Sequence, residues 1–371
     1  MAVEGAIVAR YASSGHLVYL SDPGFELSAV PFDLSSQRAT GERVVVARGG
    51  GFDVSPAGTL AYVPQGSVNL AGAGSGDLVW FDREGNQTPI PGGENVTGHP
   101  VLSPDGERVA VQTGTNAFDL YVLDLSTGGR SRVSLAGRIN NFALWSPDGE
   151  ELVFNSTRSP SGWYRKRWDA AGEAELLFPR TVGYPQITMS WSPQHDMIAY
   201  TEINPETRED IWHIASDANG DAVPLVVGPY RERTPMISPD GTRIAYLSDE
   251  TGTNEAYIAS YPDLAGKTAV SSGGATGPRW SAAGDKLYYM SGDRMMAVSV
   301  GPGTDINPSR PEELFRGNFL LDSSFHAAEY DVSRDGRFLI IRAHEAQPGP
   351  DSFNIVFNSF EELRRLAPAN R

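Results

Sequence analysis

Short apolar runs with a two-residue period recur along most of the chain. Residues 255–261 (EAYIASY) alternate in this way, which is the spacing of side chains on one face of a β-strand. Two shorter apolar runs precede them at residues 235–237 and 243–247, and a looser run follows at 268–271. Four short strands in succession, separated by polar segments, predict an antiparallel meander.

The phrase Ser-Pro-Asp-Gly separates the first two strands of this meander, at residues 238–241. Proline fixes φ at the first turn position, aspartate bonds the local backbone and glycine accepts a positive φ, so the phrase predicts a tight turn. Full copies recur at residues 103–106 and 146–149. Degenerate copies begin at Ser55, Ser192, Ser281 and Ser333, with a weaker one at Ala12.

The copies of this phrase begin 43 to 52 residues apart. A repeat of this length built from strands is typical of a β-propeller, in which each four-stranded blade buries its faces against its neighbours. We therefore predict an all-β, single-domain propeller over residues 1–371, with eight blades, or seven if the two chain ends share one blade. The predicted units are residues 6–48, 49–92, 97–135, 139–178, 184–227, 232–271, 275–316 and 326–358.

Two segments depart from the repeat. The longest insertion, residues 64–76, joins the predicted strands 60–63 and 78–81 of the second unit. At the C-terminus, residues 359–367 predict a short amphipathic helix. Ser359 and Glu362 have the spacing of a capping box, and Phe360, Leu363 and Leu366 share one helix face.

Composition excludes several kinds of site and partner. The sequence has no cysteine, which excludes disulfides, thiolate zinc sites and cysteine catalysis. The formal net charge is −16, and only residues 165–167 (RKR) cluster basic side chains, so nucleic acid and anionic membranes are disfavoured as partners. The sequence contains no run of 18 apolar residues, so no transmembrane helix is predicted. Residues 1–5 show no signal-peptide pattern. We expect a monomer.

The turn phrase and several other motifs resemble the sequences of a known kind of propeller. The repeat resembles the TolB-type, WD40-like propeller repeat. The segments GHLVY at residues 15–19, AVPFDL at 29–34, LVWFDREG at 78–85, MMAV at 295–298 and FNSFEELRRL at 357–366 are similar to the C-terminal propeller region of bacterial serine/threonine-kinase-like receptors. The resemblance covers nearly the whole chain.

That resemblance implies a sensing or protein-interaction module, placed in the periplasm or elsewhere outside the cytoplasm and downstream of a kinase domain. The sequence contains no kinase motif: it lacks the glycine-rich loop with its lysine, the His-Arg-Asp motif and the Asp-Phe-Gly motif. Any kinase activity would therefore belong to a larger parent protein.

Two of the six histidines, His99 and His326, lie just before predicted innermost strands, which would place them at the mouth of the propeller channel. Some propeller polysaccharide lyases hold a metal there with several histidines. Metal ligation normally needs three or four ligands with supporting partners. We therefore interpret these two as polar loop residues and predict neither a metal nor a cofactor.

The equivalent positions of other units carry polar, aromatic and charged side chains. In a closed ring they converge on the channel axis, as the walls of a small-ligand or peptide site would. The predicted ligand-binding residues are His99, Asn140, Asn141, Tyr184, Arg231, Glu232, Arg233, Arg279, His326 and Glu329.

The sequence favours a non-enzymatic propeller that binds a small ligand, a peptide or a protein at its channel mouth. The alternative is a propeller enzyme, a polysaccharide lyase or a hydrolase, that uses His99, His326 and nearby arginines at the same mouth. An enzyme would show at least three catalytic groups close together with a strongly shifted pKa.

Overall fold

The computed structural model describes residues 6–21, 26–55, 57–64, 75–114, 117–137, 139–180, 186–192, 194–204, 206–301, 306–320, 328–344 and 354–368. Strands dominate these residues, and one short helix lies near the C-terminus. Contacts divide the chain into two compact units. One, the propeller unit, is residues 72–344. The other, the small unit, combines residues 1–71 with 345–371.

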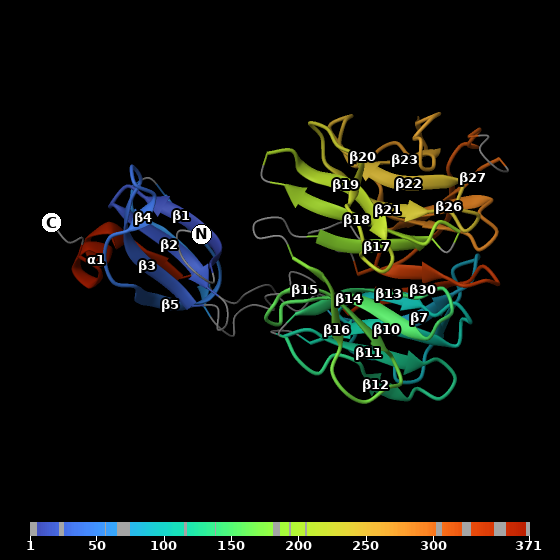
Figure 1. Ribbon diagram of the computed structural model, residues 1–371, viewed down its shortest axis with the longest axis horizontal. Helices are drawn as coiled ribbons and strands as arrows, with labels where there is room; N and C mark the ends of the chain where they lie inside the picture. The colour runs from blue at the N-terminus through green and yellow to red at the C-terminus, as the bar shows by residue number, and fades with distance from the viewer. Residues whose placement is uncertain are drawn as a thin grey trace. The chain divides into compact units, whose positions relative to one another are not determined.

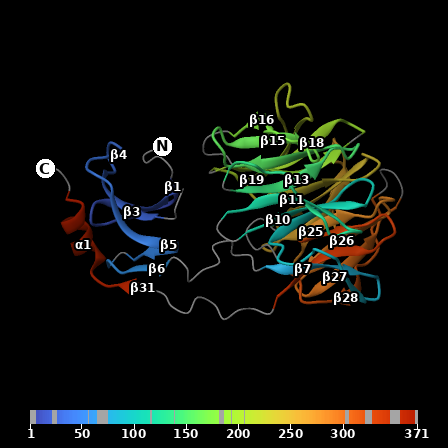
Figure 2. The ribbon, with the colours of Figure 1, turned by 90° about the horizontal axis from the view of Figure 1, so that it is seen from below.

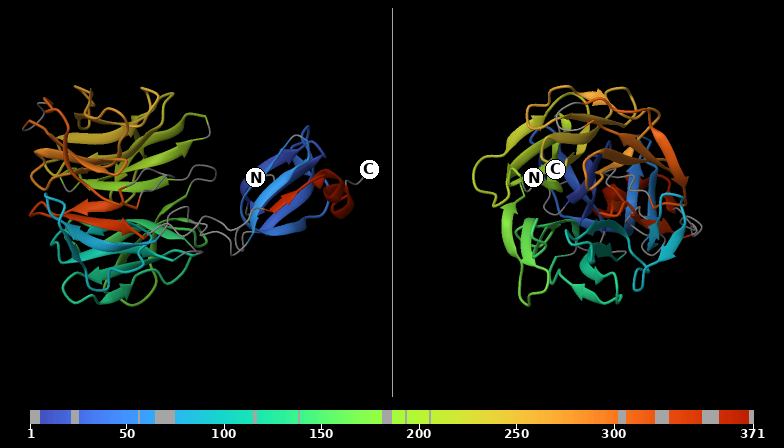
Figure 3. Two further views of the ribbon diagram at one scale, coloured as in Figure 1. Left: turned by 180° about the vertical axis from the view of Figure 1, so that it is seen from behind. Right: turned by 90° about the vertical axis from the view of Figure 1, so that its right-hand side faces the viewer.

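Six four-stranded antiparallel sheets build the propeller unit, and they follow one another in a ring (Figure 1 and Figure 3). We number these blades 1 to 6. Blade 1 contains β9 (Gly98–Leu102), β10 (Arg108–Thr113), β11 (Asp119–Asp124) and β12 (Arg130–Arg132). Blade 2 contains β13 (Asn140–Trp145), β14 (Glu151–Ser156), β15 (Gly162–Arg167) and β16 (Glu175–Pro179). Blade 3 contains β17 (Gln186–Ser192), β18 (Met197–Asn204), β19 (Arg208–Ala215) and β20 (Val223–Val226).

The remaining blades have the same order of strands. Blade 4 contains β21 (Glu232–Ile237), β22 (Arg243–Ser248), β23 (Glu255–Ser260) and β24 (Thr268–Ala269). Blade 5 contains β25 (Thr276–Trp280), β26 (Lys286–Ser291), β27 (Arg294–Ser299) and β28 (Glu312–Arg316). Blade 6 contains β29 (Tyr330–Val332), β30 (Phe338–Ala343), β7 (Gly76–Phe81) and β8 (Gln87–Pro89).

Blade 6 combines strands from both ends of the propeller unit. Strand β30 pairs with β7 in an antiparallel register that sets Leu339 opposite Trp80 and Arg342 opposite Asp77. The ladder joins residues more than 250 positions apart in sequence, so the ring closes through backbone hydrogen bonds between the two ends of the unit. Because β30 and β7 pair with each other inside blade 6, neither strand is left with an unpaired edge.

The serine of each Ser-Pro-Asp-Gly phrase organises the turn between the first two strands of its blade. In blade 4 the Ser238 hydroxyl donates to Asp240 at 2.6 Å and accepts the backbone N–H of Arg243 at 2.9 Å. The Gly241 N–H donates to the Ser238 carbonyl at 2.8 Å, with a positive φ of 72° at Gly241. Ser103 and Ser146 make the same set of bonds in blades 1 and 2.

The hydrophobic core lies between the faces of successive blades. One cluster joins Leu247 and Ile258 of blade 4 to Leu287 and Val298 of blade 5, all fully buried. Successive residues of a strand point to opposite faces of the sheet, so a run of apolar residues supplies side chains to both faces. Both faces are buried because every blade has a neighbour on either side.

The small unit is a seven-stranded sheet with the helix α1 (Ser359–Leu366). Its strand order is β1 (Ala6–Ala12), β2 (His16–Ser21), β3 (Glu26–Asp33), β5 (Val44–Val54), β6 (Leu60–Pro64) and β31 (Asn354–Val356), and β4 (Arg38–Ala39) pairs with β3. Figure 2 shows β31, from the end of the chain, beside β6 from its beginning. The propeller unit is therefore inserted, in sequence, between two neighbouring strands of this sheet.

The all-β architecture, the four-stranded antiparallel blades and the C-terminal helix agree with the prediction from the sequence, but the division of the chain differs. The described residues form seven sheets, six with four strands and one with seven, and contacts divide the chain into two compact units where the sequence predicted a single domain. Residues 78–81 were expected to pair with 60–63, yet they pair with 338–341. The local pattern defines strands and turns, but it does not specify which distant strand becomes the partner.

The helix α1 also begins differently from the prediction. Asn358, in the left-handed region with φ 56°, is the N-cap residue and makes no side-chain capping bond. Ser359 lies inside the helix, and its hydroxyl donates instead to the Gly58 carbonyl at 2.8 Å. The expected apolar face is present, because Leu363 is buried against the sheet and Phe360 packs against the same cluster.

We predict that Phe338→Ala lowers the free energy of unfolding by about 3–5 kcal/mol, because Phe338 is fully buried in blade 6 and its truncation leaves a cavity. Phe357→Ala is the matched control, since Phe357 is 74% exposed, and should change stability by less than about 0.5 kcal/mol. Urea unfolding followed by circular dichroism measures both. Equal effects of the two substitutions would contradict the placement of β30 in the core.

Candidate functional site

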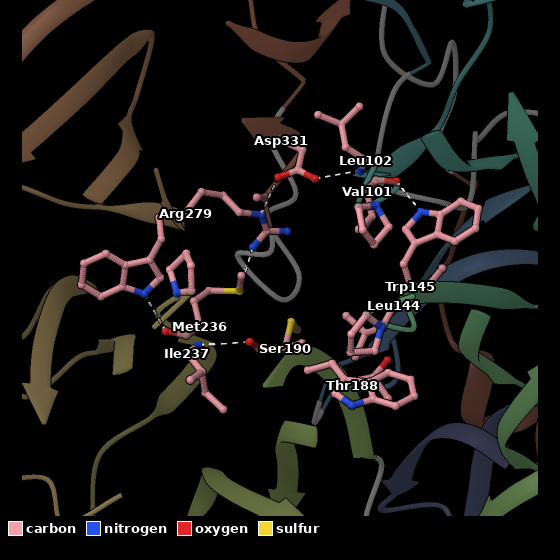
Figure 4. A pocket seen from close by; sticks show the side chains of 18 of the residues that line it. Val101, Leu102, Leu144, Trp145, Thr188, Ser190, Met236, Ile237, Arg279 and Asp331 are labelled. Atoms are coloured by element: carbon pink, nitrogen blue, oxygen red, sulfur yellow. Dashed lines mark hydrogen bonds and ion pairs between the residues drawn. The ribbon is translucent and has the colours of Figure 1, made fainter. Parts of the chain in front are cut away.

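A cavity of about 450 Å³ lies inside the propeller unit, where residues of the first strand of each blade face one another (Figure 4). It extends to the turns that follow these strands, because Pro104, Pro147 and Pro239 of the three complete Ser-Pro-Asp-Gly phrases form part of its wall. The volume is within the range of small-molecule sites.

A β-bulge interrupts the first strand of several blades at an equivalent place. His99, Phe142 and Thr234 have positive φ values of 54°, 51° and 51°, and Gly277 has 56°. The strand register shifts at the same places. An inserted residue bends the strand and redirects nearby side chains. The bulges therefore shape the wall at His99 and Phe142, which both line the cavity.

Tryptophans from three blades form much of the apolar wall. The indole N–H of Trp145 donates to the Val101 carbonyl at 2.9 Å, and that of Trp280 donates to the Met236 carbonyl at 2.8 Å. Each bond joins one blade to the preceding one. Trp191 occupies the same position in blade 3, and its indole N–H has no partner among the described residues.

Arg279 and Asp331 bring opposite charges to this wall. The Nε atom of Arg279 lies 3.7 Å from Oδ1 of Asp331. Asp331 also accepts the backbone N–H groups of Leu102 at 2.8 Å and Val332 at 2.9 Å. Burial raises the pKa of the Asp331 carboxyl, although Arg279 and the two N–H donors oppose that shift. Asp331 therefore connects blades 5, 6 and 1 at the cavity.

His99 is fixed at the wall by Glu329. Its backbone N–H donates to Oε2 of Glu329 at 2.7 Å, and its Nδ1 lies 3.6 Å from Oε1. The imidazole ring also packs on Phe142, with ring centroids 4.2 Å apart. Glu329 is only 2% exposed, so this carboxylate mainly ties blade 6 to blade 1.

Of the ten residues predicted from the sequence, the structure places His99 and Arg279 on the cavity wall. Tyr184 and His326 lie outside the described residues. The other six are not among the lining residues: Asn140, Asn141, Arg231, Glu232, Arg233 and Glu329.

Two of those six illustrate what these residues do instead. Asn140 is fully buried, where its Oδ1 accepts the Ser156 hydroxyl at 2.8 Å and its Nδ2 donates to the Phe118 carbonyl at 3.1 Å. Arg231 forms an ion pair with Glu209 at 3.5 Å. The prediction centred on the beginning of the first strands, whereas the cavity lies along these strands and toward the turns that follow them.

The sequence reasoning missed the tryptophans and Asp331. The sequence does carry a signal for the tryptophans, because Trp145, Trp191 and Trp280 each stand directly before the serine of a turn phrase. That position recurs once per blade and so faces the axis in every blade that carries it. Asp331 had no comparable signal, since it is one of 46 acidic residues.

Neither a metal site nor a membrane-spanning helix is found in the described part of the chain. No group of three or more histidine, aspartate or glutamate side chains could hold a metal ion there. Among the same residues, no helix has the length and apolar character needed to span a membrane.

Comparison with known proteins relates the chain to propellers by structure. No protein-family model matches the sequence, and no curated protein matches it. The structure is similar to a putative TolB from Agrobacterium tumefaciens, with a TM-score of 0.58 and 22% identity, covering 74% of this chain and 100% of that one. It is also similar to a chain of the nidogen/laminin complex, with a TM-score of 0.51 and 9% identity, covering 64% and 92%.

An oligogalacturonate lyase in complex with manganese aligns over 87% of this chain and 84% of its own, with 14% identity and a TM-score of 0.48, a likeness too low to carry an argument. At these identities the comparisons show the fold alone. The chain has a TolB-like β-propeller fold.

A second ionisable group of note, Glu232, lies at the beginning of β21. Burial raises the pKa of its carboxyl to about 7; the Ser248 hydroxyl and Lys267 oppose this shift, and the neighbouring carboxylates of Asp210 and Asp249 add to it. The Ser248 hydroxyl donates to Oε1 at 3.2 Å, while Oε2 is buried without a partner among the described residues. Folding therefore favours the protonated carboxyl more than the unfolded chain does.

We predict that Glu232→Gln stabilises the protein at pH 8 by about 1–3 kcal/mol relative to the original chain, and that this difference disappears toward pH 4.5. Between the unfolded pKa near 4.5 and the folded value of about 7, the folded state binds the proton more tightly, so stability falls as the pH rises. Urea unfolding at several pH values measures it.

Glu313→Gln is the control, because Arg316 lowers the pKa of the exposed Glu313 carboxyl and its pH dependence therefore lies below pH 4.5. A Glu232→Gln variant that keeps the original pH dependence between pH 5 and 8 would refute the assignment.

Proposed function

We propose that this chain is a non-enzymatic binding propeller whose central cavity holds a small ligand or a short peptide. The observation that carries the proposal is the cavity itself. Its walls combine tryptophan, methionine and proline side chains with a few polar groups, among them Arg279 and Asp331. Binding sites typically have this composition, with apolar surface for affinity and a few placed polar groups for orientation.

Bonds between blades hold the wall in place before any ligand arrives. The Thr188 hydroxyl donates to the Phe142 carbonyl at 2.6 Å, and the Ile237 N–H donates to the Ser190 hydroxyl at 3.1 Å. All four residues line the cavity. A preformed wall supports binding because less conformational entropy is lost when the ligand is immobilised.

The biological setting follows from the sequence resemblance. We place the chain as the C-terminal sensing module of a larger bacterial kinase-like receptor, on the extracytoplasmic side, where it would act as a monomer and bind a ligand or a protein partner. The net charge of −16 disfavours nucleic acid as that partner. The TolB-like fold supports a binding role without identifying the partner.

A lyase or hydrolase in the same cavity is the alternative. Its specific support is Asp331, a cavity-lining carboxyl whose pKa is raised by burial and which lies beside Arg279. His99, the other candidate, is fixed by Glu329 and packed on Phe142, which favours a structural role for it.

Incubation with polygalacturonate, with and without manganese, should yield no unsaturated product absorbing at 235 nm. Turnover that is lost in Asp331→Asn would establish the enzyme instead.

We predict that peptides selected from a random heptapeptide phage library on the folded full chain bind in the cavity. Met236→Trp, which fills the wall beside Arg279, should weaken their binding at least about tenfold because it occupies the ligand's space. Val223→Trp is the control, since Val223 lies on the outermost strand of blade 3 and is 47% exposed. Fluorescence anisotropy with labelled peptides measures both. No enrichment of peptides, or equal binding to both variants, would count against the proposed function.

A further inference from the structure

Arg279 has weak partners for a side chain in an apolar cavity. Its Nη1 atom donates to the Met236 sulfur at 3.0 Å and to the Pro278 carbonyl at 3.3 Å, and its Nε lies 3.7 Å from Asp331. Sulfur is a poor acceptor, and 3.7 Å is too long for a hydrogen bond. Its Nη2 has no partner among the described residues, and Figure 4 shows the guanidinium directed toward the open centre. The side chain is only 13% exposed, so water alone satisfies it poorly.

A second arginine stands at the turn end of the same cavity. Arg334 lies in the turn of blade 6, lines the cavity and is exposed. No ion pair or hydrogen bond of its side chain occurs within the described part of the chain. Several other arginines of this acidic chain form ion pairs, as Arg316 does with Glu313 at 2.8 Å. The cavity wall therefore carries two arginines and a single carboxylate, although the whole chain has a net charge of −16.

Together these residues define what the cavity recognises. We propose that its ligand carries a carboxylate, which accepts hydrogen bonds from Nη2 of Arg279, and an apolar group that packs on Trp145, Trp191 and Trp280. The inference rests on the proposed binding function. Arg334 attracts the anion at the opening, and the guanidinium offers the planar donors that suit a carboxylate.

Asp331 limits the charge of that ligand. Its carboxylate, 3.7 Å from Nε of Arg279, already offsets part of the positive charge. A phosphate with two negative charges would be repelled by Asp331, whereas a carboxylate adds only one charge. The apolar wall of tryptophan and methionine also favours a ligand with an aromatic or aliphatic body over a sugar phosphate.

The test uses matched acids and amides with the full chain. The probes are 3-phenylpropionate and 3-phenylpropanamide, and the peptide acetyl-Ala-Ala-Phe with either a free or an amidated C-terminus. Saturation-transfer NMR and isothermal titration calorimetry measure binding. We expect each acid to bind about tenfold or more tightly than its amide, because a charge-assisted hydrogen bond is lost in the amide. Binding of the peptide acid alone would identify a peptide as the source of the carboxylate, whereas binding of both acids would show that a free small acid suffices.

Variants assign the effect to residues. Arg279→Met should abolish the preference for acids, while Arg334→Met should reduce it and weaken its dependence on salt. Arg334 is exposed and unpaired within the described residues, so its substitution leaves the fold intact and keeps the test valid if Arg279→Met unfolds. Arg316→Met, on the outermost strand of blade 5, is the matched control and should preserve the preference.

The outcomes separate the two claims. Equal binding of acid and amide would overturn the carboxylate inference and leave the binding function standing. A preference for acids that survives both Arg279→Met and Arg334→Met would also overturn it. Failure of all four probes to bind, while selected heptapeptides do bind, would overturn the inference alone; failure of every probe and every peptide would overturn the binding function as well.

Discussion

The pairing of β30 with β7 is the interaction on which the rest of the propeller unit depends. Each blade is a four-stranded sheet with two apolar faces, and no blade can bury both faces alone. The ring buries all of them only if its last blade meets its first. Blade 6 achieves this with two strands from the end of the unit and two from its beginning. The contacts are distant in sequence, so the entropy lost in closing the ring must be offset by the whole set of blade interfaces.

Closure also creates the cavity. Blade 6 reaches blade 1 through two carboxylates, because Glu329 accepts the His99 N–H and Asp331 accepts the Leu102 N–H. His99, Leu102 and Asp331 all line the cavity, so the residues that complete the ring also complete the wall. Arg279 belongs to the same arrangement, because its Nε lies 3.7 Å from Asp331 and its guanidinium is directed toward the centre of the cavity. The residues that complete the ring are thus also residues of the proposed binding site.

The sequence predicted the strands and turns, which depend on neighbouring residues, but not the pairing of strands that are distant in sequence. The serine, aspartate and glycine of each turn phrase act within six residues, as the bonds of Ser238 show, so strands and turns could be predicted. The partner of residues 78–81 could not be predicted, because the same alternation suits a neighbouring hairpin and a strand 260 residues away. Ser359 failed as a cap for a related reason, since Gly58, distant in sequence, supplies the acceptor that its hydroxyl uses. His99 and Arg279 were predicted from their position in the repeat. The place of Asp331 at the cavity could not be predicted, because it depends on contacts of blade 6 with blades 5 and 1.

The most direct test of this account is a cysteine crosslink across the closing ladder. The chain has no native cysteine, so Asp77→Cys with Arg342→Cys introduces one defined pair. These residues are directly opposite in the β7–β30 register, and the account predicts that mild oxidation joins them in nearly all molecules, as peptide mass mapping would show. The comparison pair is Tyr62→Cys with Val79→Cys, which lie on neighbouring strands only if residues 60–63 and 78–81 share a blade. A crosslink in the comparison pair, and none between residues 77 and 342, would contradict the closure of the ring by both ends of the propeller unit.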